Sequence, residues 1–445
     1  MPIKFLITVL IFGLLLDTAF GQQPYNINLE QAKKMASDHN TQLLVQKEKI
    51  AENQERVNEA KSWRYPILLA NANYVYNGVS NDVTIPKGSL GNYAANNILV
   101  PDKDITLLKS QHNLYAVGVL AIQPILDQGK INTGLKVANI EVEIAHTRVL
   151  QTEQELNQSV EKLYYGTLIT QKKEESIKTD IELVKVKLYD EEGSLLAGKT
   201  DSVVKTGLQA DLAYQEEKLL GATNERKDNE SDLAIIMGLS YNDSIVLTEQ
   251  PSSLPAVQSL EHYLQSGKSN NLDIQLAQQM IQKASYNVTA AKKDYLPSLN
   301  AVAGYYNQSL ISVLPVNNYF IGVMASWNFI DFGKRKAVLN ERMSQHKQAE
   351  LNFNDSKKKV DNEIFKAYRK VIQSLELLAA TQKTLDYRRA DYKLKKDHSD
   401  AGLILPKDLL ETRATLVKAE EDYFSLQLTY RLSKTALEKL AGILK

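Results

Sequence analysis

The amino-acid sequence carries the same pattern twice, and this internal repeat limits the possible folds of the chain more than any other feature. The stretch AIQPILDQGKINTGLKVANI begins at Ala121, and SWNFIDFGKRKAVLNERMSQ begins at Ser326. In each stretch, a strand-like segment is followed by Asp-x-Gly-Lys and then by the pattern of a long polar helix. We therefore expect an internal two-fold sequence repeat, with the same elements in the same order in both halves.

Two alignments describe this repeat. An offset of 231 residues aligns the segments that precede the first strands, and an offset of 204 residues aligns those that follow, as for Tyr115 and Tyr319. The extra residues of the first half lie in the loop 77–114, where the second half has only 308–318. An insertion in a packed helix would rotate every later side chain off its face, whereas a surface loop accepts it. The loop 77–114 is therefore expected at an exposed end.

The segments after the repeated motif are predicted to be two very long helices. No proline interrupts 128–195 or 332–398, and apolar residues recur there at steps of three and four. A helix of this length is about 100 Å long, which exceeds the size of an ordinary globular domain. A narrow apolar stripe on a polar helix is also what a plain coiled coil shows. Shorter helices are predicted at 28–65, 203–239, 259–296 and 405–442.

Pairs of strands separate the helices. Pro66 and Pro297 are expected to end the preceding helices, because proline moves the residue before it out of the helical region. In the last strand, large apolar side chains at every second position alternate with small or polar ones. The apolar positions are Tyr319, Ile321, Val323, Ala325, Trp327 and Phe329. This alternation, with aromatic residues near the ends, is typical of a lipid-facing strand, although a half-buried strand of a soluble sheet shows it too.

The two Asp-x-Gly-Lys motifs mark the junctions from strand to helix. Asp127 and Asp331 are expected to cap the following helices by accepting hydrogen bonds from their free N–H groups. Gly129 and Gly333 are expected to permit tight backbone geometry at the turn. Their position places these junctions at the boundary between membrane and periplasm.

The N-terminus and the composition indicate export. Lys4, the apolar run FLITVLIFGLLL and small residues up to Gly21 predict a signal peptide at 1–21. No later segment is long and apolar enough for a transmembrane helix, so only a β-barrel could carry the mature chain across a bilayer. The net charge of +0 predicts no nucleic-acid partner, and the absence of cysteine excludes disulfides and thiol chemistry.

The predicted organisation has two repeats and a linker. After the signal peptide, the first repeat spans 22–240 and contains a helix, a β-hairpin at 66–126 and a long helix pair at 128–240. A linker at 241–258 carries a possible short strand, Ile245–Leu247. The second repeat, 259–445, contains a helix, a hairpin at 297–330 and a long helix pair at 332–442.

Four strands cannot close a barrel, and an open sheet edge cannot stand in lipid. Several copies of the chain are therefore expected to combine, each adding four strands to one barrel. The helices below the barrel would then form a ring as well. The fold class is thus mainly α with membrane β, with outer-membrane lipid as a partner.

At this point the chain resembles the TolC-type outer-membrane efflux proteins over the whole mature sequence. The resemblance lies in NINLEQAKKMASDHNTQL, AAKKDYLPSLNAVAGYY, WNFIDFGKRKAVL and AGLILPKDLLETRATLVKAEEDYF, in that order and spacing. It implies a homotrimer, with a twelve-stranded outer-membrane β-barrel and a long α-helical barrel in the periplasm. It further implies a passive duct, supplied by an inner-membrane pump of the RND, ABC or MFS type through a periplasmic adaptor.

The resemblance also suggests a gate. Turns near Gly198 and Gly402 would form the periplasmic tip, and the family carries two carboxylates six and nine residues after the second tip glycine. Asp408 and Glu411 occupy those positions here. Three copies would bring six carboxylates together, which would attract cations and raise some of the pKa values. The alternative is that Asp408 only offsets a helix dipole. The arginine that locks the family's closed tip is replaced by Ile404, so that lock does not carry over.

The sequence contains no catalytic motif, phosphate loop or group of metal ligands at suitable spacing, so we expect no enzyme activity, no cofactor and no metal. Two other functions remain open. The same duct could secrete polypeptides, as in type I secretion, because a generic pore does not identify its cargo. Alternatively, the chain could be a periplasmic coiled-coil scaffold without a pore.

Overall fold

The computed structural model describes residues 25–79, 81–93, 98–248, 254–311 and 314–444. The predicted signal peptide, 1–21, lies outside these residues. The chain divides into two compact units, and each draws on both halves of the sequence. Unit 1 takes its described residues from Met1–Lys49, Ala145–Gln278 and Asn352–Lys445, and unit 2 consists of Ile50–Ile144 and Gln279–Leu351. The division into two sequence repeats and a linker stays a prediction.

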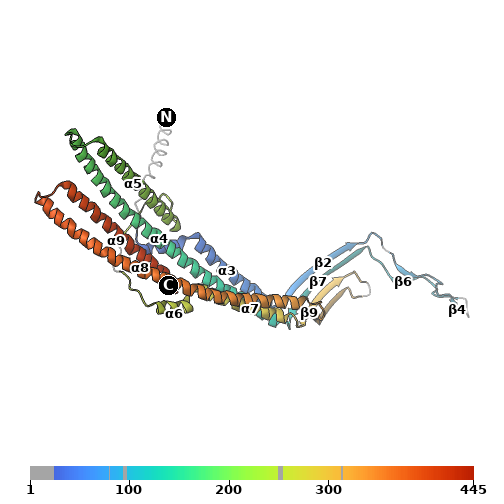
Figure 1. Cartoon of the computed structure of the whole chain (residues 1–445). Helices are drawn as coiled ribbons and strands as arrows, with labels where there is room; N and C mark the ends of the chain where they lie inside the picture. The colour runs from blue at the N-terminus through green and yellow to red at the C-terminus, as the bar shows by residue number, and fades with distance from the viewer. Residues whose placement is uncertain (1–24, 80, 94–97, 249–253, 312–313, 445) are drawn as a thin grey trace, which may run out of the picture. The chain divides into compact units, whose positions relative to one another are not determined.

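The helices occur in the same order, and with nearly the same lengths, before and after residue 250 (Figure 1). The first set is α2 (Leu29–His39), α3 (Thr41–Ser62), α4 (Gln128–Leu196) and α5 (Ser202–Ile236). The second set is α6 (Leu260–Asn270), α7 (Leu272–Lys293), α8 (Lys334–Asp400) and α9 (Pro406–Leu440). Helices α2 and α6 have 11 residues each, α3 and α7 have 22, and α5 and α9 have 35. The long helices α4 and α8 have 69 and 67 residues, as the uninterrupted polar patterns predict.

The helices predicted at 28–65 and 259–296 are each interrupted once, which the sequence analysis missed. Asn40 ends α2 and Asn271 ends α6, both with an extended backbone. The Asn40 side chain accepts a hydrogen bond from the N–H of Leu43, and the Asn271 side chain accepts one from the N–H of Ile274. An asparagine that satisfies free N–H groups in this way starts a new helix and separates it from the old one.

Four strands of unit 2 form one antiparallel sheet in the order β10-β9-β7-β2. Its strands are β2 (Ile67–Tyr76), β7 (Asn113–Pro124), β9 (Ser298–Gln308) and β10 (Asn317–Ser326). The two predicted hairpins are therefore present, and pairing of β7 with β9 joins them, with Val119 opposite Tyr305. The loop 77–114 contains short pairs of its own: β3 (Val83–Ile85) with β6 (Ile105–Leu108), and β4 (Asn92–Tyr93) with β5 (Ile98–Leu99).

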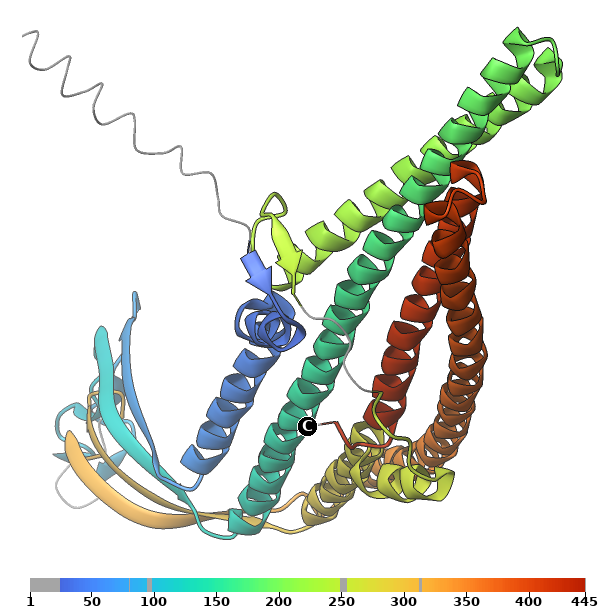
Figure 2. The same ribbon diagram turned by 90° about the vertical axis from the view of Figure 1, so that its left-hand side faces the viewer.

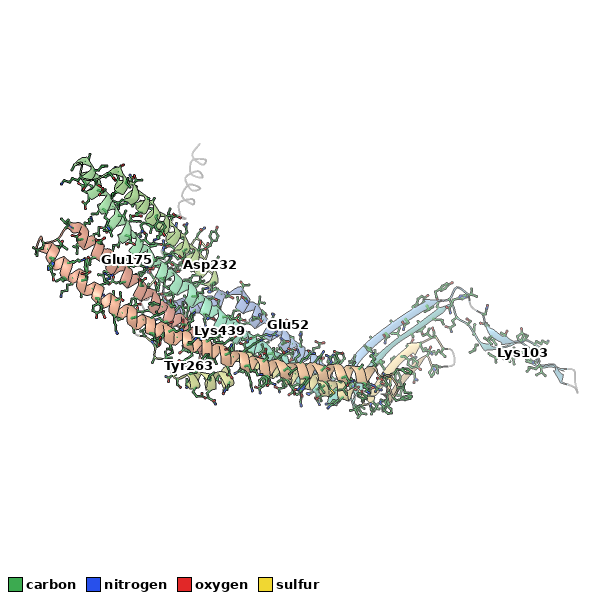
Figure 3. All side chains as sticks on the ribbon, viewed as in Figure 1. Glu52, Lys103, Glu175, Asp232, Tyr263 and Lys439 are labelled. Atoms are coloured by element: carbon green, nitrogen blue, oxygen red, sulfur yellow. The ribbon has the colours of Figure 1, made fainter. Side chains whose placement is uncertain are left out.

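Unit 1 packs its helices around two hydrophobic clusters. One gathers side chains of α2, α4, α5 and α9, where Tyr164 is fully buried and its hydroxyl donates to the carbonyl of Ile27 at 3.2 Å. The other lies between α6, α8 and α9 and includes Tyr263, labelled on α6 in Figure 3. Next to the first cluster, β1 (Tyr25–Ile27) pairs in parallel with β8 (Ile245–Leu247), side by side in Figure 2. The short strand predicted at Ile245–Leu247 is confirmed.

Helix α8 buries only a narrow stripe, as its sequence predicts, whereas α4 buries side chains on several sides in its middle part, such as Tyr164, Tyr165 and Thr167. On α8 the buried side chains are Val360, Ile364, Val371, Ser374, Leu378 and Leu385. Steps of three, four and seven residues keep these side chains on one side of the helix. Among the described residues, no helix combines the length and the apolar character that a transmembrane helix requires.

Candidate functional site

One face of the four-stranded sheet is covered with exposed apolar side chains. The register places Ala70 opposite Val119, Val119 opposite Tyr305, and Tyr305 opposite Tyr319, so these side chains lie on the same face. Tyr319 is 83% exposed, and Ile321, two residues further on, is 86% exposed. A continuous apolar patch of this kind needs a cover, and its aromatic residues at the strand ends are typical of a lipid-facing sheet.

The outer strands of this sheet have unpaired edges. β2 and β10 each have one neighbour within the described residues, β7 and β9 respectively. Their outer edges therefore carry backbone N–H and C=O groups that point away from the sheet. Such groups need partners wherever water is excluded, so the edges are suited to pairing with strands of another chain.

At the second strand-to-helix junction, Asp331 caps the start of α8. Its carboxylate accepts hydrogen bonds from the backbone N–H of Gly333 at 3.2 Å and of Arg335 at 3.1 Å. The Arg335 side chain adds an ion pair with a nitrogen–oxygen distance of 2.5 Å. Phe332 and Gly333 both have positive φ angles, +50° and +95°, which bend the backbone tightly around the carboxylate. The glycine at this position fits a conformation that other residues adopt at a cost.

The first junction has the same motif but lacks this geometry. The predicted cap at Asp127 is wrong in the described part of the chain, where no N–H group donates to its carboxylate; only its backbone C=O accepts, from Lys130 and Ile131. Gly129 is the second residue of α4 and has no positive φ angle, so the turn does not use its conformational freedom. Helix α4 already starts at Gln128, one residue after the aspartate, which leaves its carboxylate beside the helix end.

Helix α7 holds the start of α4 instead. The ammonium group of Lys293 donates to the C=O of Gly129 at 2.5 Å and to the hydroxyl of Thr133 at 2.8 Å. Lys130 forms an ion pair with Asp294 at 2.6 Å. These contacts fix the first turn of α4 against the last turn of α7.

The prolines predicted to end helices lie immediately before strands. Helix α3 ends at Ser62 and β2 starts at Ile67, directly after Pro66. Helix α7 ends at Lys293 and β9 starts at Ser298, directly after Pro297. In both cases the helix stops a few residues before the proline, and the proline starts the extended segment, as its restriction of the preceding residue favours.

The helix pairs end at the two predicted tip glycines. Gly198 follows α4 with φ +69°, and Gly402 follows α8 with φ +71°. At each tip, backbone N–H groups return to carbonyls of the last helical turn, for example Gly402 N–H to Ser399 C=O at 2.9 Å. This is the usual glycine C-cap, which turns the chain sharply into the next helix.

The two predicted gate carboxylates lie in the first turns of α9 after Pro406. Asp408 is half-buried in the first turn, and Glu411 is exposed. The Glu411 carboxylate accepts a hydrogen bond from the side chain of Lys187 on α4 at 2.8 Å. This hydrogen bond lowers the pKa of Glu411, and the charge of the same lysine acts in the same direction. Within one chain, Glu411 therefore stays ionised more readily than a free glutamate.

Sequence analysis missed the groups that connect α4 to α9 near the tips. Besides the pair of Lys187 and Glu411, Arg413 contacts Glu182 with a nitrogen–oxygen distance of 3.5 Å. The partners are 224 and 231 residues apart in the chain. No local pattern connects residues at such separations, and only complementary charges at equal heights of two neighbouring helices could have suggested them.

Among the described residues, no group of three or more histidine, cysteine, aspartate or glutamate side chains could hold a metal ion. The main features of the candidate site are thus an apolar sheet face, two unpaired sheet edges, and charged side chains near the helix tips.

Known proteins share this sequence pattern and fold. The family model for outer membrane efflux proteins matches residues 33–239 and 263–443. Nodulation protein T of Rhizobium leguminosarum bv. trifolii is 26% identical over 188 residues, which cover 41% of this chain and 40% of that protein's length. The outer membrane protein VceC of Vibrio cholerae has a similar structure, with a TM-score of 0.72, 15% identity, and coverage of 93% of this chain and 96% of that one. The CmeC outer membrane channel of Campylobacter jejuni gives a TM-score of 0.72 at 16% identity, covering 93% of this chain and 85% of that one.

The family model covers most of the chain, and the fold agrees with that of solved outer-membrane channels, which contain a long α-barrel and a β-barrel. Family and fold are those of channel proteins and not of enzymes. The chain belongs to the outer membrane efflux protein family.

Proposed function

We propose that this protein is the outer-membrane duct of a tripartite efflux system. In this proposal, three copies close a twelve-stranded barrel in the outer membrane, and their helices project into the periplasm. A periplasmic adaptor and an inner-membrane pump of the RND, ABC or MFS type supply the energy, so that small molecules leave the cell passively. The observation that carries the proposal is a four-stranded sheet with an apolar face and unpaired edges at β2 and β10.

Disulfide cross-linking tests the assembly. The chain has no cysteine, so introduced thiols react on a clean background. Each variant chain carries Ala72→Cys on β2 together with one cysteine on β10, and the position on β10 is scanned from variant to variant. Because the edges must pair between copies, we expect covalent trimers at one register of β10 and almost none two residues away. If the purified protein stays monomeric in detergent and forms no pore in planar bilayers, the duct proposal is wrong.

The gate belongs to the same proposal. Asp408 and Glu411 from three copies would ring the periplasmic mouth and attract cations. The links of α9 to α4 through Lys187 and Arg413 offer a way to hold the tip closed without the family arginine that Ile404 replaces. Opening would then require that α9 separate from α4.

Single-channel recording tests the gate. We expect that the double variant Asp408→Asn, Glu411→Gln loses cation preference and block by divalent cations. Lys187→Ala should raise the open probability, because it removes one link between α4 and α9. Lys173→Ala is the matched control, since Lys173 pairs with Glu225 of α5 and lies on the same long helix. An unchanged cation preference in the double variant would show that Asp408 and Glu411 do not form a cation-selective ring.

Export of a polypeptide by the same duct is the second candidate. A deletion strain separates the two cargoes, because loss of efflux makes cells more sensitive to toxic small molecules, whereas loss of secretion removes a protein from the medium. A scaffold without a pore would be extracted from envelopes by salt or high pH, whereas a barrel in lipid requires detergent.

A further inference from the structure

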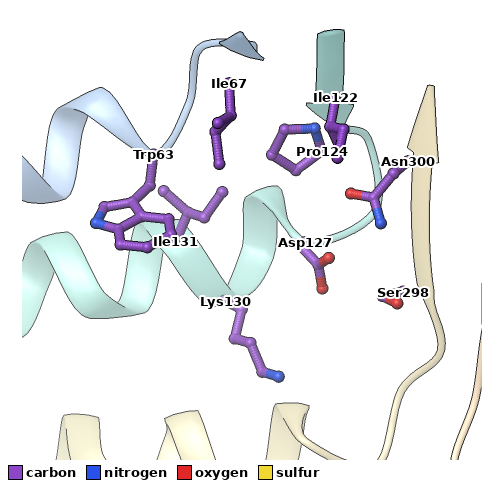
Figure 4. A pocket seen from close by; sticks show the side chains of 9 residues that line it. All are labelled: Trp63, Ile67, Ile122, Pro124, Asp127, Lys130, Ile131, Ser298 and Asn300. Atoms are coloured by element: carbon purple, nitrogen blue, oxygen red, sulfur yellow. The ribbon is translucent and has the colours of Figure 1, made fainter. Parts of the chain in front are cut away.

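A cavity of about 560 Å³ lies at the first strand-to-helix junction, within unit 2. Figure 4 shows its lining from the end of α3, from β2, β7 and β9, and from the start of α4. The side chains of Trp63, Ile67 and Ile131 lie at one end, and those of Asp127, Ser298 and Asn300 at the other. A largely apolar cavity of this size with a few polar groups at one end has the properties of a site for a small amphiphilic molecule.

The sheet register places this cavity on the face opposite the apolar one. Ile67 pairs with Ile122, and Pro124 pairs with Asn300. Each of these residues is one position away from a residue of the outward apolar face, such as Leu68 or Ala121. Because successive side chains of a strand point to opposite faces, the cavity opens on the inner face of any barrel that this sheet helps to close.

Two charged side chains line the cavity, and only one of them has a partner of opposite charge. Lys130 lines it, but its ammonium group lies 2.6 Å from the Asp294 carboxylate, which balances its charge. The Asp127 carboxylate has no hydrogen-bond or ion-pair partner in the part of the chain that the structure describes. Arg64 lies close in sequence, but its side chain donates to Asn132 and does not line the cavity. The ammonium group of Lys293 is nearby, where it donates to the C=O of Gly129 and to the Thr133 hydroxyl, but Lys293 does not line the cavity. The one charge in the cavity without a partner among the described residues is therefore negative.

We propose that this cavity binds amphiphilic organic cations, with Asp127 facing the positive charge and Trp63 and its apolar neighbours holding the hydrocarbon part. An indole ring beside the ligand favours a cation further. The site then lies on the exit path and retains such molecules briefly as they leave the channel. This placement on the path rests on the proposed duct function, whereas binding to the cavity does not.

Tryptophan fluorescence measures the binding directly. The chain has two tryptophans, Trp63 in the cavity and Trp327 directly after β10. The variant Trp327→Phe therefore leaves Trp63 as the only tryptophan reporter. The probe is tetraphenylphosphonium, and tetraphenylborate is its anionic counterpart of the same shape. We expect a saturable change in Trp63 emission with the phosphonium and a much weaker response to the borate.

Asp127→Asn in this background is the decisive variant. Removal of the charge should weaken phosphonium binding about tenfold, because one partly screened charge pair contributes on that order. Borate binding should stay equal or become stronger. The matched control is Asp331→Asn, which changes the equivalent position of the other half. There the carboxylate already forms an ion pair with Arg335, and asparagine can still cap the helix. Thermal unfolding of both variants shows whether the fold is intact.

Two outcomes would overturn the inference. Either the phosphonium and the borate bind equally, or Asp127→Asn leaves the phosphonium affinity unchanged in a folded protein. Single-channel current recording distinguishes failure of the cation site from failure of the duct proposal. A protein that conducts but shows no charge-selective Trp63 response refutes only the cation site. A protein that binds the phosphonium selectively but conducts no current refutes the duct and leaves the site standing.

Discussion

The two strand-to-helix junctions share a sequence motif but differ in how they use it. Asp331 accepts hydrogen bonds from two backbone N–H groups and forms an ion pair with Arg335. Asp127, its counterpart in the first half, makes none of these contacts within the described residues, and its helix is held by Lys293 from α7. The comparison teaches that a repeated motif fixes the position of a turn, whereas the backbone conformation of that turn decides whether its carboxylate caps the helix, since at the two junctions only Phe332 and Gly333 have positive φ angles.

The same contrast recurs elsewhere in the two halves. Gly238 and Gly442 both follow a helix of 35 residues and both have positive φ angles, +78° and +65°. A Cβ atom at Gly238 would meet the side chain of His39, whereas one at Gly442 would meet the backbone carbonyl of Asn270. Both contacts would be equally short, far below a van der Waals distance, so neither position has room for a Cβ atom, although the atom that it would meet differs. The predictions below test the differences between the halves.

The largest effect is expected for Gly442→Ala. Alanine would adopt a disfavoured backbone conformation there, and its methyl group would clash with a backbone carbonyl that cannot move freely. We therefore expect the free energy of unfolding to fall by about 3 kcal/mol or more. Gly402→Ala, which has a similar φ angle but open space around it, should cost only about 1 kcal/mol. Thermal unfolding in detergent gives the ranking. Equal losses for the two variants would mean that the packing at Gly442 is not what distinguishes it.

Asn271→Ala should have the next largest effect. Asn271 is buried and its side chain serves the N–H groups of Asp273 and Ile274 as well as the C=O of Leu440. Loss of this side chain leaves buried groups unpaired, so we expect the free energy of unfolding to fall by about 2 to 3 kcal/mol. In the first half, Asn40→Ala removes one hydrogen bond, to Leu43, and should cost about 1 kcal/mol. Denaturant unfolding of both variants measures the difference, and a larger loss for Asn40→Ala would reverse the comparison.

Asp331→Ala should lower the melting temperature measurably through loss of its helix cap, whereas Asp127→Ala should leave the melting temperature nearly unchanged. The difference arises because only Asp331 accepts bonds from the start of its helix. Asp331→Asn is the control, since asparagine caps nearly as well. If Asp127→Ala were as damaging as Asp331→Ala, the aspartate of the first junction would have a structural partner after all.

The smallest effect concerns the link between Lys187 and Glu411, which is solvent-exposed and should contribute only a few tenths of a kcal/mol. Its pH dependence has a definite sign. Because the pKa of Glu411 is lowered in the folded chain, the link is intact above the usual glutamate pKa of about 4.3 and is lost as the pH falls through the lowered pKa. The open probability of the channel should therefore rise only in strong acid. Glu411→Gln should remove this rise, and Glu225→Gln should leave it unchanged.

Several features follow from the sequence because they depend on neighbouring residues. The step of three and four residues on α8 predicts the buried stripe, and the alternation along β10 predicts its exposed apolar face. Prolines at 66 and 297 mark the starts of β2 and β9, and the glycines at 198 and 402 mark the ends of the long helices. Each of these properties arises from backbone sterics or from the period of one element, and both are present in the local sequence.

Tertiary structure alone decided the contacts between distant segments. Pairing of β7 with β9, parallel pairing of β1 with β8, and the link between Lys187 and Glu411 each join residues more than a hundred positions apart. The different roles of Asp127 and Asp331 belong here too, because the shared motif does not specify whether the aspartate will accept from the first N–H groups of its helix or whether Lys293 of α7 will bond to a carbonyl of that turn. Hydrogen bonds and ion pairs act over a few ångströms in space, so the packed chain must first bring the partners together before their chemistry can be known.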